Sequence, residues 1–229
     1  MSALSHVRVM FATPTFEKSV SVDYHTSMLE SIVEIQRHGG AWCSHVEAGG
    51  HWTDLARNHA VKAFLESDCT DLLFIDADQG WDAKAIPRIL RYEEDVVAAL
   101  PPKKCDPPEF HCNAITGVIA PNGLFQALEA GTGCMRLRKA VFERMNKAFP
   151  ELQALKEQEF GWPDTPYFQA GNTKYGRIGE DIFFCRQLVA MGEFAWIDAD
   201  VTFTHRGSKA WKGNFYEHAV KTGLLKLAA

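Results

Sequence analysis

The sequence contains no long apolar run, no Cys-x-x-Cys pair and no excess of positive charge. None of its apolar stretches approaches the roughly 20 residues that a membrane-spanning helix needs, and the first residues lack the apolar segment of a secretory signal. The six cysteines show no spacing typical of zinc ligands. We therefore expect a cytoplasmic protein with free thiols and without a membrane span.

The charge balance excludes a further class of partners. The net charge is −5 at pH 7, so no overall positive field attracts nucleic acid or an anionic membrane. The 46% hydrophobic share and the 23% charged share are typical of a globular protein with a full core. Because the 229 residues show no internal repeat, low-complexity tract or linker, we expect a single domain over residues 1–229.

The most informative stretch is Asp71–Trp81, which begins with the apolar run Leu72–Ile75. Such a short run predicts a strand buried on both faces, as in a parallel sheet. Asp76 and Asp78 follow at its carboxyl end, where open α/β sheets bind their ligands. Two adjacent carboxylates repel each other, and a divalent cation such as Mg²⁺ or Mn²⁺ relieves that repulsion. The alternative is that Asp76 caps a turn and that Asp78 is solvated.

The remaining hydrophobic pattern alternates between strands and helices, which predicts an α/β fold. The expected strands are 7–12, 41–47, 72–75, 95–100, 124–129, 194–198 and 201–204, and the expected helices are 23–37, 53–67, 83–92, 138–149 and 179–191. Residues 105–121 show little periodicity. Residues 150–177 read as a long loop, and a loop of that length in a compact domain is usually a lid or a binding loop.

Polar side chains follow several of these elements. Thr13-Pro14-Thr15 ends the first strand, Arg57 lies in the first turns of a helix, and Lys103-Lys104 follows the strand at 95–100. Each fits an ordinary turn or a solvated side chain as well as a ligand contact. Gly131-Thr132-Gly133 would let backbone approach a ligand, although a single Gly-x-Gly is weak evidence.

Two further groups lie late in the chain. Glu180 and Asp181 open a helix, where the helix dipole favours acidic residues and is expected to lower the pKa of Asp181. His205 follows a short apolar strand and precedes Arg206-Gly207-Ser208-Lys209. Without further information, His205 reads as a core histidine that has its hydrogen bonds satisfied.

Taken in order from about Val7 to Lys209, these parts resemble a GT-A-fold glycosyltransferase and are similar to glycosyltransferase family 2. The resemblance implies a Rossmann-like mixed, mostly parallel sheet flanked by helices. It also implies a nucleotide-diphosphate-sugar donor, expected to be a UDP-sugar, whose pyrophosphate is bound through Mn²⁺ or Mg²⁺. The acceptor is not indicated. The chain is shorter than many members, which argues against a processive polysaccharide synthase and leaves the acceptor site to residues 150–177 and the tail after Trp211.

The resemblance also assigns roles by position. Asp181 matches the general base of inverting members, with Glu180 nearby. The matched metal ligands are Asp76, Asp78 and His205. The matched nucleotide and phosphate contacts are Thr13, Pro14, Thr15, Arg57 and Asp76, with Lys103, Arg206 and Lys209 as further candidates.

Three alternatives remain open. A haloacid-dehalogenase-type phosphatase would use Asp76 as its nucleophile, but that motif normally lies on the first strand and continues with Thr or Val rather than Gln79-Gly80. A nucleotidyltransferase of related fold would have a glycine-rich loop after the first strand, and residues 11–15 contain no glycine. The third alternative is a catalytically inactive module that binds a sugar or a nucleotide.

Overall fold

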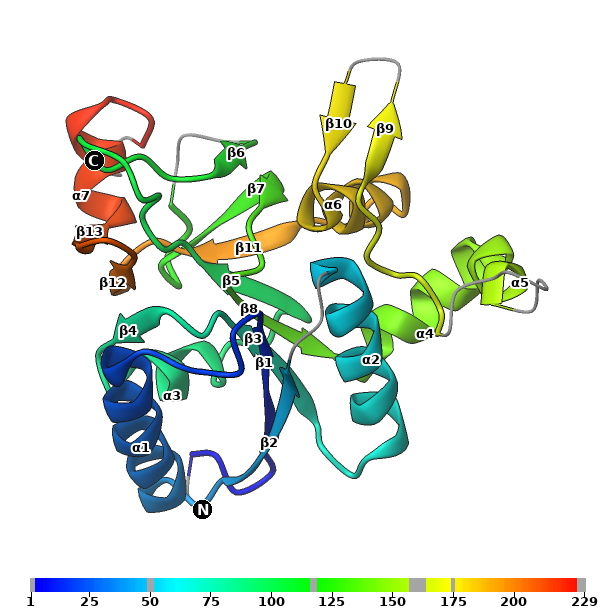
Figure 1. Ribbon diagram of the computed structural model, residues 1–229, viewed down its shortest axis with the longest axis horizontal. Helices are drawn as coiled ribbons and strands as arrows, with labels where there is room; N and C mark the ends of the chain where they lie inside the picture. Colours follow the sequence, from blue (N-terminus) through cyan, green and yellow to red (C-terminus); the bar gives the residue numbers. More distant parts are fainter. Residues whose placement is uncertain (1–2, 49–51, 116–118, 157–163, 174–175, 226–229) are drawn as a thin grey trace.

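The computed structural model describes residues 3–48, 52–115, 119–156, 164–173 and 176–225. Its centre is an eight-stranded sheet with the strand order β2-β1-β3-β8-β5-β11-β7-β6 (Figure 1). These strands are β1 Arg8–Thr15, β2 Ala41–Ala48, β3 Asp71–Ile75, β5 Val96–Ala99, β6 Cys112–Ala114, β7 Leu124–Ala130, β8 Cys134–Arg138 and β11 Ala195–Asp198.

The direction of the strands decides where their ends meet. β1 is parallel to β2 and β3, and β5 is parallel to β11, whereas β8 and β7 run antiparallel to both of their neighbours. The other six strands therefore share one direction, which confirms the expected mixed, mostly parallel sheet. The carboxyl ends of β1, β3 and β5 consequently meet at one edge.

Helices cover both faces of this sheet. They are α1 Val22–Arg37, α2 Thr53–Glu66, α3 Ala85–Ile89, α4 Lys139–Ala148, α5 Pro150–Lys156, α6 Glu180–Ala190 and α7 Phe215–Lys221. One apolar cluster packs α1 and α3 on one face, and a second packs α2, α4, α6 and α7 on the other (Figure 1). In β3, Leu72 and Phe74 belong to the second cluster and Leu73 and Ile75 to the first. This alternation confirms the strand buried on both faces.

A small antiparallel sheet closes one side of the edge where the strands end. It consists of β4 Gln79–Trp81, β12 Thr202–Arg206 and β13 Ala210–Asn214 in the order β13-β12-β4. His205 pairs with Gln79 in this sheet, so the late part of the chain lies directly beside the segment that follows β3. Strands of three residues carry too little periodicity to be predicted, which explains why β4 was not expected.

The long loop expected over residues 150–177 is wrong in part. Its first residues form α5, for which Pro150 in the first turn is favourable because that position needs no backbone donor. Its later residues form the hairpin of β9 Gly171–Thr173 and β10 Gly176–Ile178. Residues 157–163 and 174–175 of the expected loop lie outside the described residues. The helix expected at 83–92 is likewise shorter than predicted and spans only Ala85–Ile89.

No helix within the described ranges is both long enough and apolar enough to cross a membrane.

Candidate functional site

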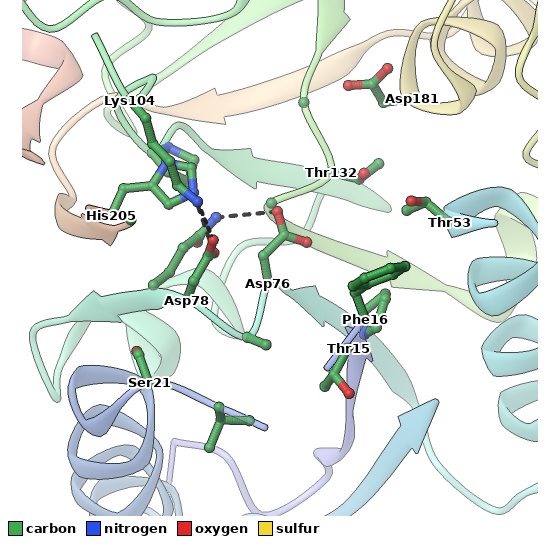
Figure 2. A pocket seen from close by; sticks show the side chains of 18 of the residues that line it. Thr15, Phe16, Ser21, Thr53, Asp76, Asp78, Lys104, Thr132, Asp181 and His205 are labelled. Carbon is green, nitrogen blue, oxygen red and sulfur yellow. Dashed lines mark hydrogen bonds and ion pairs between the residues drawn. The ribbon is translucent and has the colours of Figure 1, made fainter. Parts of the chain in front are cut away.

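A pocket of about 970 Å³ lies at the carboxyl edge of the sheet. It collects side chains from the ends of β1, β3 and β5, from α2 and α6, and from β12 (Figure 2). Nine of the residues predicted for the site line it: Pro14, Thr15, Arg57, Asp76, Asp78, Lys103, Glu180, Asp181 and His205. The topology thus brings together residues that are up to about 190 positions apart in the sequence.

Asp76 is the first residue after β3. Its backbone N–H donates to the carbonyl of Gly133 at 3.1 Å, which fixes the turn into the pocket. Its carboxylate accepts hydrogen bonds from Nη2 of Arg57 at 3.3 Å and from Nε2 of Gln79 at 3.4 Å. The carboxylate is therefore oriented by two donors that come from different elements.

Arg57 lies at the base of the pocket with only 3% of its surface exposed. Its Nε donates to Oε1 of Glu180 at 3.2 Å, and its guanidinium lies over the ring of Phe74 at 5.1 Å. Its Nη1 has no hydrogen-bond partner among the described residues. An unpaired buried donor costs about 1–3 kcal/mol, so a polar ligand or a water molecule that bonds to this atom would stabilise the site.

Two other buried polar atoms of the lining are also without a partner in the described part of the chain. They are Oγ1 of Thr15, on β1, and Oε1 of Gln79, on β4. Because most buried polar groups in proteins are hydrogen-bonded, a cluster of unsatisfied atoms around one cavity indicates a polar occupant.

Asp78 has a positively charged or protonatable neighbour on each oxygen. Nζ of Lys104 lies 2.5 Å from Oδ2, and Nε2 of His205 lies 3.3 Å from Oδ1 (Figure 2). Burial raises the pKa of Asp78, but the hydrogen bonds from His205 and Lys104 outweigh it, so the pKa lies below the ordinary value. Asp78 is therefore ionised at neutral pH.

The orientation of His205 fits a metal ligand. Its Nδ1 lies 2.7 Å from the backbone carbonyl of Pro102, which can only accept a hydrogen bond, so Nδ1 carries the hydrogen. In the neutral ring the lone pair then lies on Nε2, which faces the carboxylate of Asp78. Two lone-pair atoms in contact need a proton or a cation between them. Metal-bound histidines commonly donate their second ring nitrogen to a carbonyl in this way.

The donor set fits a divalent ion held by Asp78 and His205. A separation of 3.3 Å between the two donor atoms is close to that of neighbouring ligands on one ion, for which bonds of roughly 2.1 Å give about 3 Å. The carboxylate of Asp76 faces Arg57 and Gln79 rather than this pair, and its expected part in a metal site stays a prediction. The described residues contain no group of three His, Cys, Asp or Glu side chains that could hold an ion.

Asp181 is the second residue of α6 and lies across the pocket from Asp78 and His205 (Figure 2). Its Oδ1 accepts a hydrogen bond from the backbone N–H of Ile182 at 2.7 Å. Burial, followed by the negative charge of Glu180, raises the pKa of Asp181, and the bond from Ile182 only partly offsets this. The expectation that the helix N-terminus lowers this pKa is therefore wrong. Burial raises this pKa by more than the helix terminus lowers it.

Three predicted contacts do not line the pocket. Thr13 is buried beneath it, where its hydroxyl bonds to the hydroxyl of Tyr24 at 2.5 Å. The guanidinium of Arg206 pairs with Asp23 on α1, with Nη2 3.3 Å from Oδ1. Lys209 lies in the turn between β12 and β13, and its ammonium pairs with Asp106.

Gly133 is a site residue whose missing side chain makes room for two polar side chains of the pocket. A Cβ atom at this position would lie 2.6 Å from Nε2 of Gln79 and 3.1 Å from Oδ2 of Asp76. The absence of a side chain thus lets Gln79 and Asp76 approach the backbone at this position. The sequence marked the position through Gly131-Thr132-Gly133, and the approach of a ligand to this backbone stays a prediction.

The sequence marked Lys104 only as one of two lysines after the strand at 95–100, and its contact with Asp78 was not predicted. The contact of Gln79 with Asp76 was also missed, although Gln79 is next to Asp78 in the sequence. The contact of Lys104 with Asp78 joins the segment after β5 to the segment after β3. A contact between such distant segments cannot be predicted from a local sequence pattern.

Comparison with known proteins supports the fold. No protein-family model and no curated protein matches the chain. Among solved structures, A197 from STIV has 16% sequence identity and a TM-score of 0.55, and the match covers 88% of this chain and 86% of that one. This likeness shows a shared fold, in agreement with the mixed sheet and its flanking helices.

Two further structures resemble the chain more loosely. A glycosyltransferase involved in the glycosylation of the major capsid of PBCV-1 has 15% identity and a TM-score of 0.36, and the match covers 70% of each chain. The inositol-1-phosphate CTP transferase from T. maritima has 9% identity and a TM-score of 0.45, and the match covers 89% of each chain. None of these matches assigns the chain to glycosyltransferase family 2.

Proposed function

We propose that the pocket binds a nucleotide-diphosphate-sugar and transfers the sugar to the hydroxyl of an acceptor. The observation that carries this proposal is the pair Asp78–His205 on one side of the cavity and the half-buried carboxylate of Asp181 on the other. Asp78 and His205 suit the binding of a divalent ion and a diphosphate. The carboxylate of Asp181 suits the removal of a proton from the acceptor.

The diphosphate end of the site would use Asp78 and His205 to hold Mn²⁺ or Mg²⁺. When bound, such an ion supplies positive charge to the departing diphosphate. Lys103 and Lys104 line the same side and add positive charge. The unpaired Nη1 of Arg57 supplies a buried donor for a phosphate or nucleotide oxygen. Pro14 and Thr15 lie at the end of β1 and contribute the wall on which the nucleotide rests.

The transfer step requires that a proton leaves the acceptor. Its hydroxyl oxygen forms a bond to the anomeric carbon of the sugar while the bond from that carbon to the diphosphate oxygen breaks. The nucleoside diphosphate leaves with the bonding electrons, and the carboxylate of Asp181 takes the hydroxyl proton. A raised pKa makes Asp181 a stronger base, which suits this role. Direct displacement of this kind inverts the anomeric configuration.

Glu180 serves this arrangement through its neighbours. Its carboxylate holds Nε of Arg57, and its negative charge adds to the raised pKa of Asp181. It is therefore a positioning residue rather than the base. UDP is the expected nucleotide, and the acceptor is a hydroxyl compound that reaches the Asp181 side of the pocket.

The experiment is a turnover screen of nucleotide-diphosphate-sugars with and without Mn²⁺, in the wild-type protein and in Asp78→Asn. We expect hydrolysis or transfer of at least one donor with Mn²⁺, and its loss in Asp78→Asn at an unchanged melting temperature. Turnover that is equal in the two proteins, or no turnover of any donor, would contradict the proposal.

A further inference from the structure

Asp78 carries two partners, and only one of them is held in place by the rest of the protein. We propose that Lys104 acts as an exchangeable counter-ion: it occupies Asp78 in the ligand-free protein and moves to the diphosphate when a divalent cation takes its place. The inference rests on the proposed function for the identity of the diphosphate. The exchange itself is a property of Asp78, Lys104 and His205.

The contacts of Asp78 show why a divalent cation has to displace one of its two partners, Lys104 or His205. Oδ2 of Asp78 is 2.5 Å from Nζ of Lys104, and Oδ1 is 3.3 Å from Nε2 of His205. Both oxygens of the carboxylate are therefore engaged. A divalent ion that approaches Asp78 meets the ammonium of Lys104 as a like charge at close range, and like charges repel strongly where water is partly excluded.

His205 is the partner that stays. It belongs to β12, which is paired on both sides, by β13 and by β4. Its second ring nitrogen is fixed by the carbonyl of Pro102 at 2.7 Å, and its side chain is only 18% exposed. Once the cation replaces the proton on Nε2, the imidazole in this orientation presents its lone pair to the cation.

Lys104 is the partner that leaves. It lies in the segment after β5, outside the strands, and its side chain is 37% exposed. Its Cδ lies beside Gly207, where a Cβ atom would approach it to 3.2 Å. A lysine is a point charge on a flexible stem, and a short rotation keeps it in the same pocket. When Lys104 leaves the carboxylate of Asp78, a bound diphosphate offers its ammonium another negatively charged partner.

The exchange predicts effects of opposite sign for two ligands. Replacement of Lys104 by methionine removes a competitor of the metal, so the free protein should bind Mn²⁺ more tightly, by roughly 3- to 10-fold. The same replacement removes a charged hydrogen bond to the diphosphate, so UDP in saturating Mn²⁺ should bind roughly tenfold or more weakly. If Lys104 only stabilised the fold, its replacement would not strengthen Mn²⁺ binding and weaken UDP binding at the same time.

The test measures Mn²⁺ affinity of the free protein by electron paramagnetic resonance, and UDP affinity in saturating Mn²⁺ by calorimetry, in wild type, Lys104→Met and Lys104→Gln. Lys209→Met is the matched control, because it removes the same charge near the site, but Lys209 does not line the pocket and its ammonium pairs with Asp106. We expect tighter Mn²⁺ binding and weaker UDP binding in both Lys104 variants. In Lys209→Met, the Mn²⁺ affinity should stay within about twofold of wild type.

The outcomes separate the inference from the proposed function. Unchanged or weaker Mn²⁺ binding in the Lys104 variants, or no Mn²⁺ binding in any of the proteins, would overturn the exchange. Unchanged UDP binding in the Lys104 variants, or an equal gain of Mn²⁺ affinity in Lys209→Met, would overturn it as well. If the two affinities shift as expected but no nucleotide-sugar is turned over, the exchange stands and the transferase proposal fails.

Discussion

The substitution Asp181→Asn separates a catalytic base from a residue that only stabilises its helix. Asparagine keeps an oxygen that accepts the N–H of Ile182, now at 2.7 Å, but it cannot take up a proton. The pKa of Asp181 is raised, first by burial and then by Glu180, so its ionised form is less favourable in the folded protein than in the unfolded chain. At neutral pH that charge therefore opposes folding.

The two expected effects of Asp181→Asn have opposite directions. Loss of the base should lower transfer by roughly 10²–10⁴-fold, which corresponds to about 2.7–5.4 kcal/mol of transition-state stabilisation. Removal of the charge should leave the free energy of unfolding at pH 7 unchanged or raise it. Binding of the donor should stay near the wild-type value, because Asp181 does not touch the Asp78–His205 side. The assays are transfer kinetics, thermal unfolding and donor titration.

A matched control exists at the start of α2. Asp54 is the second residue of its helix, as Asp181 is of α6, and its Oδ1 likewise accepts the next backbone N–H at 2.9 Å. Because Asp54 does not line the pocket, Asp54→Asn should leave transfer within a few-fold of wild type. If Asp181→Asn retains transfer within a few-fold, or if the product keeps the anomeric configuration of the donor, Asp181 is not the base.

Two further substitutions test the surroundings of the site. The raised pKa of Asp181 places the acid limb of the kcat/KM profile above the ordinary aspartate pKa of about 3.9. Glu180→Gln should move that limb to lower pH, because the negative charge of Glu180 contributes to the raised pKa. A limb at the same pH in Glu180→Gln would refute this cause. Gly133→Ala should lower the free energy of unfolding by about 1–3 kcal/mol and weaken donor binding, because its Cβ would lie 2.6 Å from Gln79. Gly171→Ala, whose Cβ meets nothing within 4 Å, should change neither, and equal effects of the two glycine variants would contradict this reading.

The part of the site that the sequence predicted depends on local signals. The apolar run before Asp76 marks a buried strand by itself, and the carboxyl edge of a parallel sheet is where such residues gather. Helix starts are equally local, which is why the position of Asp181 was found. The pairing between elements is not local. Nothing near Arg57 in the sequence indicates that Asp76 and Glu180 will share its guanidinium.

The predictions that did not reach the pocket have physical reasons. Successive side chains in a strand point to opposite sides, so Arg206 faces away from the side that His205 faces and meets Asp23 instead. Thr13 and Thr15 share a face of β1, but Thr13 lies deeper in the sheet, where Tyr24 of α1 covers it. The position of Lys209 depends on β13, which the sequence did not predict. Without β13, the turn that carries Lys209 away from the pocket could not be predicted either.

The most direct test of the proposed function is a crystal structure with Mn²⁺ and UDP. We expect Mn²⁺ to lie within roughly 2.0–2.3 Å of Nε2 of His205 and of a carboxylate oxygen of Asp78. The diphosphate should lie in the same pocket within hydrogen-bond reach of Lys104. A nucleotide bound outside this pocket, or an ion that contacts neither Asp78 nor His205, would contradict the proposed function.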